Sequence, residues 1–234
     1  DSDQMKKIFL SFLLILSVSY LSAKHIIGGE MYYTYLGKGS APNTSKYRIT
    51  LKLFRDDFAP ADAAAMPPDV YIGIFNNDNN QQFPGPGQPK IVRMDGSQSV
   101  TVNPFSSCMV NRPRLSYQSA TYGVEVELPD NRSGYTATYQ TCCRITPIDN
   151  IFNNGNSGAG STFSCEIPTE PDNSPQFSES IDAVCGGKGF DLQFRATDKD
   201  GDSLSYAFEG AFNGGAAQNA TNINPAPPPY GYVS

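Results

Sequence analysis

Three aspartates stand at alternate positions of a short acidic segment, Asp198, Asp200 and Asp202, with Gly201 between the last two. Carboxylates with this spacing can gather oxygen ligands for a hard cation such as calcium. The segment does not match an EF-hand, because the glycine comes too early and no glutamate closes the loop. An ordinary Asp-Gly hairpin turn is the alternative. The segment therefore predicts a turn, either alone or with bound calcium, and calcium is the one cofactor that the sequence suggests.

The disulfide candidates are the five cysteines of the chain: Cys108, Cys142, Cys143, Cys165 and Cys185. Cysteines of exported proteins mostly form disulfides, and an odd number leaves at least one free or paired with another chain. Cys142 and Cys143 are neighbours in a predicted strand, so their side chains point to opposite faces and meet different partners. Their spacing is not that of a Cys-x-x-Cys metal or redox motif. The sequence does not choose among the possible pairings.

The segment Ile26-Ile27-Gly28-Gly29 is similar to the N-terminus of an activated trypsin-like protease. That chemistry needs a histidine base beside a nucleophilic serine. His25 is the only histidine and precedes the motif, so activation would remove it, and no Gly-Asp-Ser-Gly-Gly is present. We therefore expect no catalytic residues and a non-catalytic protein. A carboxylate-dependent hydrolase is the one enzyme class left as a hypothesis, because it needs only two acids.

Residues 1–23, a few upstream positions followed by a basic, an apolar and a small-residue part, have the layout of a secretory signal. Lys6 and Lys7 form the basic part, Ile8–Val18 the apolar part, and Ala23 offers a cleavage position. The apolar part is too short to span a bilayer permanently. The chain is therefore expected to be secreted or to lie at the outer cell surface.

The net charge of the chain is −6, and no block of basic residues is present. Binding to nucleic acid or to an anionic membrane would need such a block, so neither is expected. No later apolar segment is long enough for a membrane span, so the protein is not expected to cross a membrane once the signal is removed. The expected partner is an unknown protein or glycan at a cell surface.

The composition, with 21 Gly, 18 Pro, 13 Tyr and 14 Phe, favours short strands joined by turns. Tyr47–Leu53 alternates apolar and polar residues, which is typical of a strand with one wet face. Other strand-like runs are Met31–Leu36, Val70–Phe75, Ile91–Met94, Ser99–Val102, Tyr122–Leu128, Tyr135–Ile145, Thr162–Ile167, Phe190–Ala196 and Leu204–Phe208. Only Pro60–Met66 suggests a short helix. Many short strands without helices between them predict an all-β fold, an antiparallel, immunoglobulin-like β-sandwich.

A linker is predicted at 168–175, where the sequence Pro-Thr-Glu-Pro-Asp-Asn-Ser-Pro has linker composition. The first β-sandwich domain would then span 24–167. The remaining range, 176–234, has too few strand-like segments for a complete sandwich. We expect it to be a truncated immunoglobulin-like or cadherin-like domain at the front of a longer protein.

Several motifs occur together in an order that resembles the start of gliding-motility-associated surface proteins of the Bacteroidota. They are His25–Met31, Tyr47–Asp56, Tyr139–Arg144, Asn173–Pro175, Ala196–Tyr206 and Pro227–Tyr230. The resemblance implies a long, multi-domain, adhesin-like protein exported by the type IX secretion system, with immunoglobulin-like or cadherin-like modules. The chain departs from this family at Asp57 and at Phe208–Gly210, where relatives often have a cysteine. The resemblance supplies no catalytic residues.

The leading hypothesis is a non-catalytic contact module of a secreted or cell-surface protein, which presents loops such as Asn76–Pro89 and Asn153–Gly160. A carbohydrate-binding module is the alternative, since exposed tyrosines can stack on sugar rings. The candidates for such stacking are Tyr32, Tyr33, Tyr35 and Tyr117.

Overall fold

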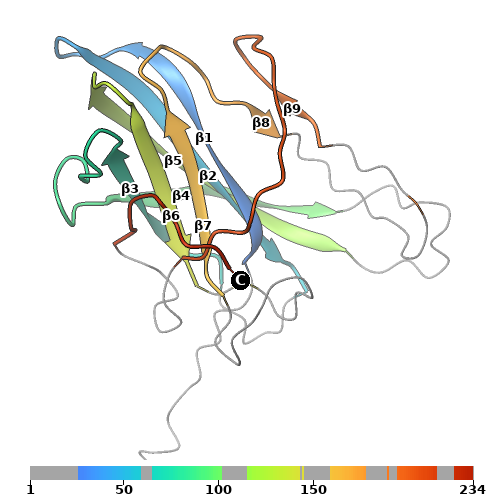
Figure 1. The fold of residues 1–234 in the computed structure, drawn as a ribbon. Helices are drawn as coiled ribbons and strands as arrows, with labels where there is room; N and C mark the ends of the chain where they lie inside the picture. The colour runs from blue at the N-terminus through green and yellow to red at the C-terminus, as the bar shows by residue number, and fades with distance from the viewer. Residues whose placement is uncertain are drawn as a thin grey trace, which may run out of the picture.

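The computed structural model describes residues 26–58, 65–101, 115–142, 144, 159–177, 189, 194–214 and 224–233. Within these ranges the protein consists of β-strands and loops, without a helix (Figure 1). The expected all-β class is therefore confirmed for the described residues. The expected secretion signal and most of the expected helix at Pro60–Met66 lie outside them.

The strands, in chain order, are β1 (Ile26–Lys38), β2 (Thr44–Asp56), β3 (Asp69–Asn76), β4 (Lys90–Thr101), β5 (Ser116–Pro129), β6 (Tyr135–Thr141), β7 (Ser161–Ile167), β8 (Gln176–Phe177) and β9 (Ala196–Thr197). Strands β1 to β7 form one antiparallel sheet in the order β1-β2-β5-β4-β3-β6-β7. Because β3, β4 and β5 form a meander with β2 at one side and β6 at the other, the topology contains two overlapping Greek keys. Strands β8 and β9 form a separate two-residue ladder.

The sheet bends because β4 changes partner along its length. Lys90–Arg93 pairs with β3, and Met94–Thr101 pairs with β5, with a register shift between Met94 and Gly96. Such bulges bend a strand and turn the corner of a sheet. The edge strands thereby approach each other: a Cβ atom on Gly29 of β1 would lie 3.0 Å from the Phe163 ring of β7. The result is a curled, nearly barrel-like sheet, and the finer expectation of an immunoglobulin-like sandwich stays a prediction.

The core lies inside this curl and confirms the alternation predicted for Tyr47–Leu53. The inward side chains of that run, at positions 47, 49, 51 and 53, are each at most 3% exposed. They pack against inward residues of the other strands, among them Ile72, Tyr122 and Tyr139. Each large apolar side chain buried in this way contributes about 1.5–3 kcal/mol. The core is therefore the main source of stability for the elements that carry the site.

Four strand predictions differ from the structure. Ile91–Met94 and the described part of Ser99–Val102, which ends at Thr101, belong to one strand, β4, because a bulge interrupts the alternation without ending the pairing. The run from Tyr135 ends as a strand at Thr141, and Leu204–Phe208 is not a strand. The side chain of Phe208 is 95% exposed, so its apolar character does not report burial.

The segment 168–175 is not a free linker in the structure, although its composition predicts one. Asn173 is buried, and its side-chain Oδ1 accepts a hydrogen bond of 2.9 Å from the backbone N–H of Tyr35 in β1. The backbone N–H of Tyr33 donates to Ser174 Oγ at 2.8 Å. These are outward-facing backbone groups of an edge strand, which would otherwise be open to another chain. We call Asp172–Ser174 the β1 strap.

The opposite edge of the sheet, β7, is also contacted by residues far along the chain. Thr162 Oγ1 donates to the carbonyl oxygen of Asn213 at 2.7 Å, and Gly160 N–H donates to Asn213 Oδ1 at 2.9 Å. Ala226 N–H donates to Gln140 Oε1 at 2.9 Å, and Tyr230 OH bonds to Thr138 Oγ1. Described parts of 176–234 therefore pack on the first sheet. That this range belongs to a further domain stays a prediction.

Candidate functional site

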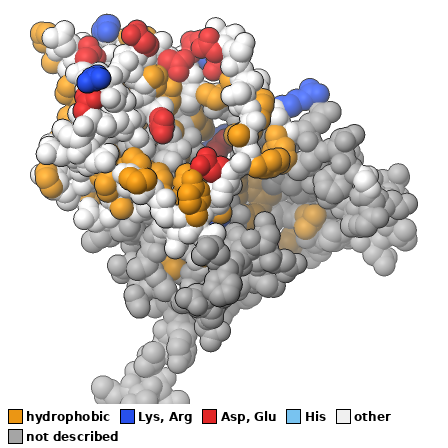
Figure 2. Space-filling model, in the orientation of Figure 1, with side chains coloured by type: hydrophobic (Ala, Val, Ile, Leu, Met, Phe, Trp, Pro, Cys, Tyr) orange, Lys and Arg blue, Asp and Glu red, His pale blue; other side chains and the backbone are white. Residues whose placement is uncertain are grey.

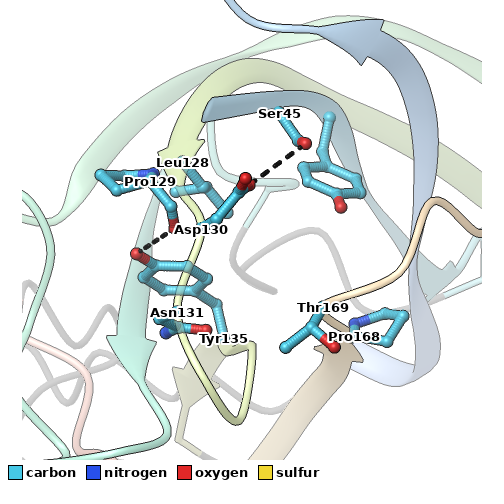
Figure 3. Close-up of a pocket in the computed structure, with 9 residues that line it drawn as sticks. Ser45, Leu128, Pro129, Asp130, Asn131, Tyr135, Pro168 and Thr169 are labelled. Atoms are coloured by element: carbon cyan, nitrogen blue, oxygen red, sulfur yellow. Dashed lines mark hydrogen bonds between the residues drawn. The ribbon is translucent and has the colours of Figure 1, made fainter. Parts of the chain in front are cut away.

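A pocket lies at the end of the sheet where β2 and β6 begin and where β5 and β7 end. It is a shallow hollow, open to solvent, whose enclosed space of about 10 Å³ has room for about one water molecule. Its lining residues, drawn in Figure 3, are Ser45, Tyr47, Leu128, Pro129, Asp130, Asn131, Tyr135, Pro168 and Thr169. Four separate parts of the chain thus build one site, because the Greek-key topology brings them together.

The turn between β5 and β6 fixes one wall of the pocket. The Asn131 side chain donates from Nδ2 to the carbonyl oxygen of Gly134 at 2.8 Å and accepts from the Gly134 N–H at 2.6 Å. Gly134 has a φ angle of +74°, which other residues rarely adopt. Tyr135 OH donates to the carbonyl oxygen of Pro129 at 2.8 Å. The amide of Asn131 and the hydroxyl of Tyr135 are therefore occupied by the protein itself.

Asp130 supplies the only carboxylate of the pocket lining. Its Oδ1 atom accepts one long hydrogen bond, 3.5 Å, from Ser45 Oγ, and the contact is drawn in Figure 3. Among the described residues, no ion pair involves Asp130. Most of its acceptor capacity is therefore available, since a carboxylate can accept about four hydrogen bonds.

The two tyrosine rings of the pocket are neutral phenols in an acidic environment. Burial raises the pKa of Tyr47 above its ordinary value, and the nearby charges of Asp130 and Asp172 add to this effect. Burial likewise raises the pKa of Tyr135, with further contributions from Asp130 and Asp78. A negative charge near a phenol disfavours the phenolate. Both rings therefore keep their uncharged form and its electron-rich faces at physiological pH.

The pocket lacks the pair of acids that a glycosidase mechanism uses, because Asp130 is its one carboxylate. The lining presents hydroxyl groups and one exposed carboxylate beside the buried rings of Tyr47 and Tyr135.

The acidic segment forms a turn in which Asp198 is the acceptor. Asp198 Oδ1 accepts from the backbone N–H groups of Asp200, Gly201 and Asp202 at 2.8, 2.9 and 3.1 Å. The Asp200 carboxylate accepts from Asn173, at 2.8 Å from its backbone N–H and at 3.0 and 3.1 Å from Nδ2. These bonds lower the pKa of Asp200. The turn is thus a support for the β1 strap.

Within the part of the chain that the structure describes, no group of three or more His, Cys, Asp or Glu residues is arranged to bind a metal. Calcium at Asp198, Asp200 and Asp202 stays a prediction, and the structure gives Asp200 another partner. Sequence reasoning missed this contact, although both segments belong to the ordered motifs described above. In the sequence, the only indication of this contact is that the two segments occur in the same ordered set of motifs.

The tyrosines expected to stack on sugars are mostly not available for that purpose. Tyr33 and Tyr117 are 4% and 5% exposed, so these two assignments are wrong. Tyr32 and Tyr35 are half-buried: the Lys52 ammonium lies 5.5 Å from the Tyr32 ring centroid, and the rings of Tyr35 and Tyr47 are 5.5 Å apart. Tyr47 and Tyr135 line the pocket, but they are 3% and 5% exposed, so their ring faces are no more available for stacking.

The described cysteines differ in state. Cys142 is buried and disulfide-bonded, whereas Cys165 of β7 is buried with a free thiol. A free cysteine agrees with the odd number in the chain. Cys108, Cys143 and Cys185 lie outside the described residues. Burial, together with the neighbouring Glu166, raises the pKa of the Cys165 thiol to about 12.

Cys165 is therefore expected to be chemically inert in the folded protein, because the thiolate is the reactive form. Iodoacetamide at pH 8 should leave Cys165 unmodified in the native chain and alkylate it fully after unfolding in guanidinium chloride without reductant. Peptide mass spectrometry measures both. Equal labelling of native and unfolded chains would contradict the buried position.

Comparison with known proteins gives no relative: no protein-family model matches the chain, and neither does any curated protein or solved structure. In the described ranges, no helix has both the length and the apolar character needed to cross a membrane. The fold and the site define the protein's class, an all-β protein with a curled seven-stranded antiparallel sheet and a pocket at one end.

Proposed function

We propose that this protein is a non-catalytic contact module that acts outside the cell, either secreted or at the outer cell surface. The observation that carries the proposal is the curled seven-stranded sheet, a rigid frame that holds exposed turns such as the one carrying Asp130. Loops positioned by a rigid β-scaffold are common binding surfaces. The signal-like layout of residues 1–23 supports export.

The resemblance to gliding-motility-associated surface proteins supports an adhesive role and export by the type IX secretion system. We propose that the whole protein consists of immunoglobulin-like and cadherin-like modules stabilised by disulfides. Its partner is a protein at a cell surface. The carbohydrate-binding module remains the second candidate.

Adhesion of whole cells tests the proposal. Beads coated with the purified chain should retain cells of the source organism under flow, and beads coated with the chemically unfolded chain should not. Equal retention by both would contradict a contact role of the folded module. Binding of the chain to neutral glycans on an array would favour the carbohydrate alternative.

A further inference from the structure

The outer strands β1 and β7 are contacted by other parts of the chain, but the last part of β4 has an open side. The strap bonds to β1, and Asn213 bonds to Thr162 of β7. Along Ser97–Thr101, β4 pairs with β5 on one side, and none of the described strands pairs with its other side. Figure 1 shows this part of β4 beside the start of β5. We call Ser97–Thr101 the open β4 edge.

The direction of the backbone groups in β5 follows from one hydrogen bond. The Asp57 N–H donates to the carbonyl oxygen of Ser116 at 3.2 Å, so the backbone groups of Ser116 point to β2. In a strand, the N–H and C=O groups of successive residues point to opposite sides. Those of Tyr117 and Ser119 therefore point to β4.

The backbone groups of the open β4 edge can be assigned in the same way. The residues of β4 that face Tyr117 and Ser119 are Val100 and Gln98, and these pairs exchange hydrogen bonds. The residues between and beside them have the opposite direction. The N–H and C=O groups of Ser97, Ser99 and Thr101 therefore point to the open side.

An earlier residue of β4 supports this assignment. Met94 faces Tyr122, whose backbone groups point to β2, so the groups of Met94 must point away from β5. The Met94 N–H indeed donates to the carbonyl oxygen of Pro68 at 2.9 Å. The side of β4 that is bonded at Met94 is thus the side that is open from Ser97 onward.

The open β4 edge lacks the residues that usually protect an edge strand, which are charged residues and proline. Residues 96–101 are Gly-Ser-Gln-Ser-Val-Thr, and they pair with β5 without a register shift. Ser97, Gln98, Ser99 and Thr101 are exposed. The neighbouring charge, on Asp95, is paired with Arg48 at 2.8 Å.

The charge of the whole chain restricts where two copies can meet. The net charge is −6, and Figure 2 shows Asp and Glu side chains gathered at the upper end of the molecule. Copies that met there would bring like charges together, which is unfavourable. The uncharged residues 96–101 carry no such cost.

We propose that two copies of this chain pair edge to edge through the open β4 edge, in antiparallel orientation and with a two-fold axis at Ser99. In this register Ser99 faces its own counterpart, and Ser97 faces Thr101 of the partner subunit. All these residues point to the open side, so the facing pairs can exchange about six backbone hydrogen bonds. One sheet then continues through both copies, in the order β1-β2-β5-β4-β4-β5-β2-β1.

The contact is small, since each copy contributes about five residues, and it is therefore weak and reversible. Copies held close together associate more readily than free copies, because their effective concentration is higher. The inference is independent of the proposed contact function, because it concerns two copies of the chain and not a different partner. The bead experiment and the experiments below can therefore fail separately.

Amide hydrogen exchange of the full chain tests the pairing residue by residue. The amides of Ser97, Ser99 and Thr101 should exchange about threefold more slowly at about 1 mM chain than at about 20 μM, which corresponds to a dimer Kd of about 0.3 mM. The Gln98 amide bonds to β5 within one copy, so it should be slow at both concentrations. Rates of the three amides that do not depend on concentration would overturn the proposal, because the edge would then be either unpaired or covered within one copy.

A pair of charge variants tests the two-fold axis. Ser99→Lys and Ser99→Asp each place like charges opposite one another, and each should raise the dimer Kd by about fivefold in sedimentation velocity. In an equimolar mixture the charges are opposite, so the Kd should return to that of the unsubstituted chain or below it. Slow exchange of the Gln98 amide shows that each variant keeps the pairing of β4 with β5.

Thr101→Lys and Thr101→Asp form the matched control. In the proposed register the two copies of this position lie about 13 Å apart along the strands, beyond the screening length in physiological salt. Mixing these two variants should change the Kd by less than about twofold. Equal recovery for the mixtures at 99 and 101, or no recovery at 99, would contradict the axis at Ser99.

Discussion

Replacing Gly134 with alanine is expected to destabilise the protein by about 3 kcal/mol. Two effects add at this position. The φ angle of +74° is unfavourable for a residue with a side chain, and the new Cβ would lie 2.1 Å from the backbone oxygen of Ile167. A backbone atom cannot move away as a flexible side chain can. The free energy of unfolding in urea measures the loss.

Gly87→Ala is the matched control for this substitution. Gly87 has a similar φ angle, +69°, but its Cβ would have no neighbour within 4 Å. The expected loss is therefore only the conformational cost, about 1 kcal/mol. If both variants lose the same stability, then the contact between the β5–β6 turn and the end of β7 is not as described.

Asn173→Ala should have the other large effect, a loss of about 2–4 kcal/mol. The substitution removes the side-chain bonds to Tyr35 and Asp200 and leaves the Tyr35 N–H without an acceptor. Leaving a polar group without a hydrogen-bond partner costs more free energy than one hydrogen bond contributes to stability. The loss is measured by urea unfolding, as above.

Asn79→Ala provides the control for the strap variant. The Asn79 side chain accepts one hydrogen bond from the Gln81 N–H in an exposed turn, so its loss should amount to less than about 1 kcal/mol. Equal effects of the two substitutions would mean that the strap does not stabilise the edge of the sheet. A selective effect of Asn173→Ala would show that it does.

The sequence predicts well what depends on local alternation. Tyr47–Leu53 alternates regularly, and its strand and buried face follow directly from a period of two. The pattern over β4 predicts two strands, because the bulge at Met94 and Gly96 breaks that period while hydrogen bonding continues. Bulges depend on the partner strand, which a local pattern does not contain.

The pocket could not be predicted, because its residues come from distant parts of the chain. Ser45, Asp130 and Thr169 meet only through the order of the strands in the sheet. The same holds for the strap: proline and asparagine in 168–175 predict a linker on composition, although Asn173 is buried by its contacts with Tyr35 and Asp200. Composition indicates the local backbone conformation that a segment prefers. It does not show which distant groups will form hydrogen bonds with its polar atoms.

The tyrosines show the limit of assigning roles by residue type. Tyr33 and Tyr117 are core residues, whereas Tyr47, predicted only as part of a strand, lines the pocket. Alternation assigns a face to each residue of a strand but not its position relative to the end of the sheet. That position decides which inward tyrosine lines the hollow at the end of the sheet.

The central structural claim is that the strap following β7 covers the edge of β1 and thereby fixes the pocket wall at Pro168 and Thr169. Native-state hydrogen exchange of the Tyr33 and Tyr35 amides tests it most directly. Because both amides donate to the strap, they should exchange as slowly as the Leu51 amide in β2, through global unfolding. Exchange of Tyr33 and Tyr35 at the rate of an uncovered edge strand would contradict the claim.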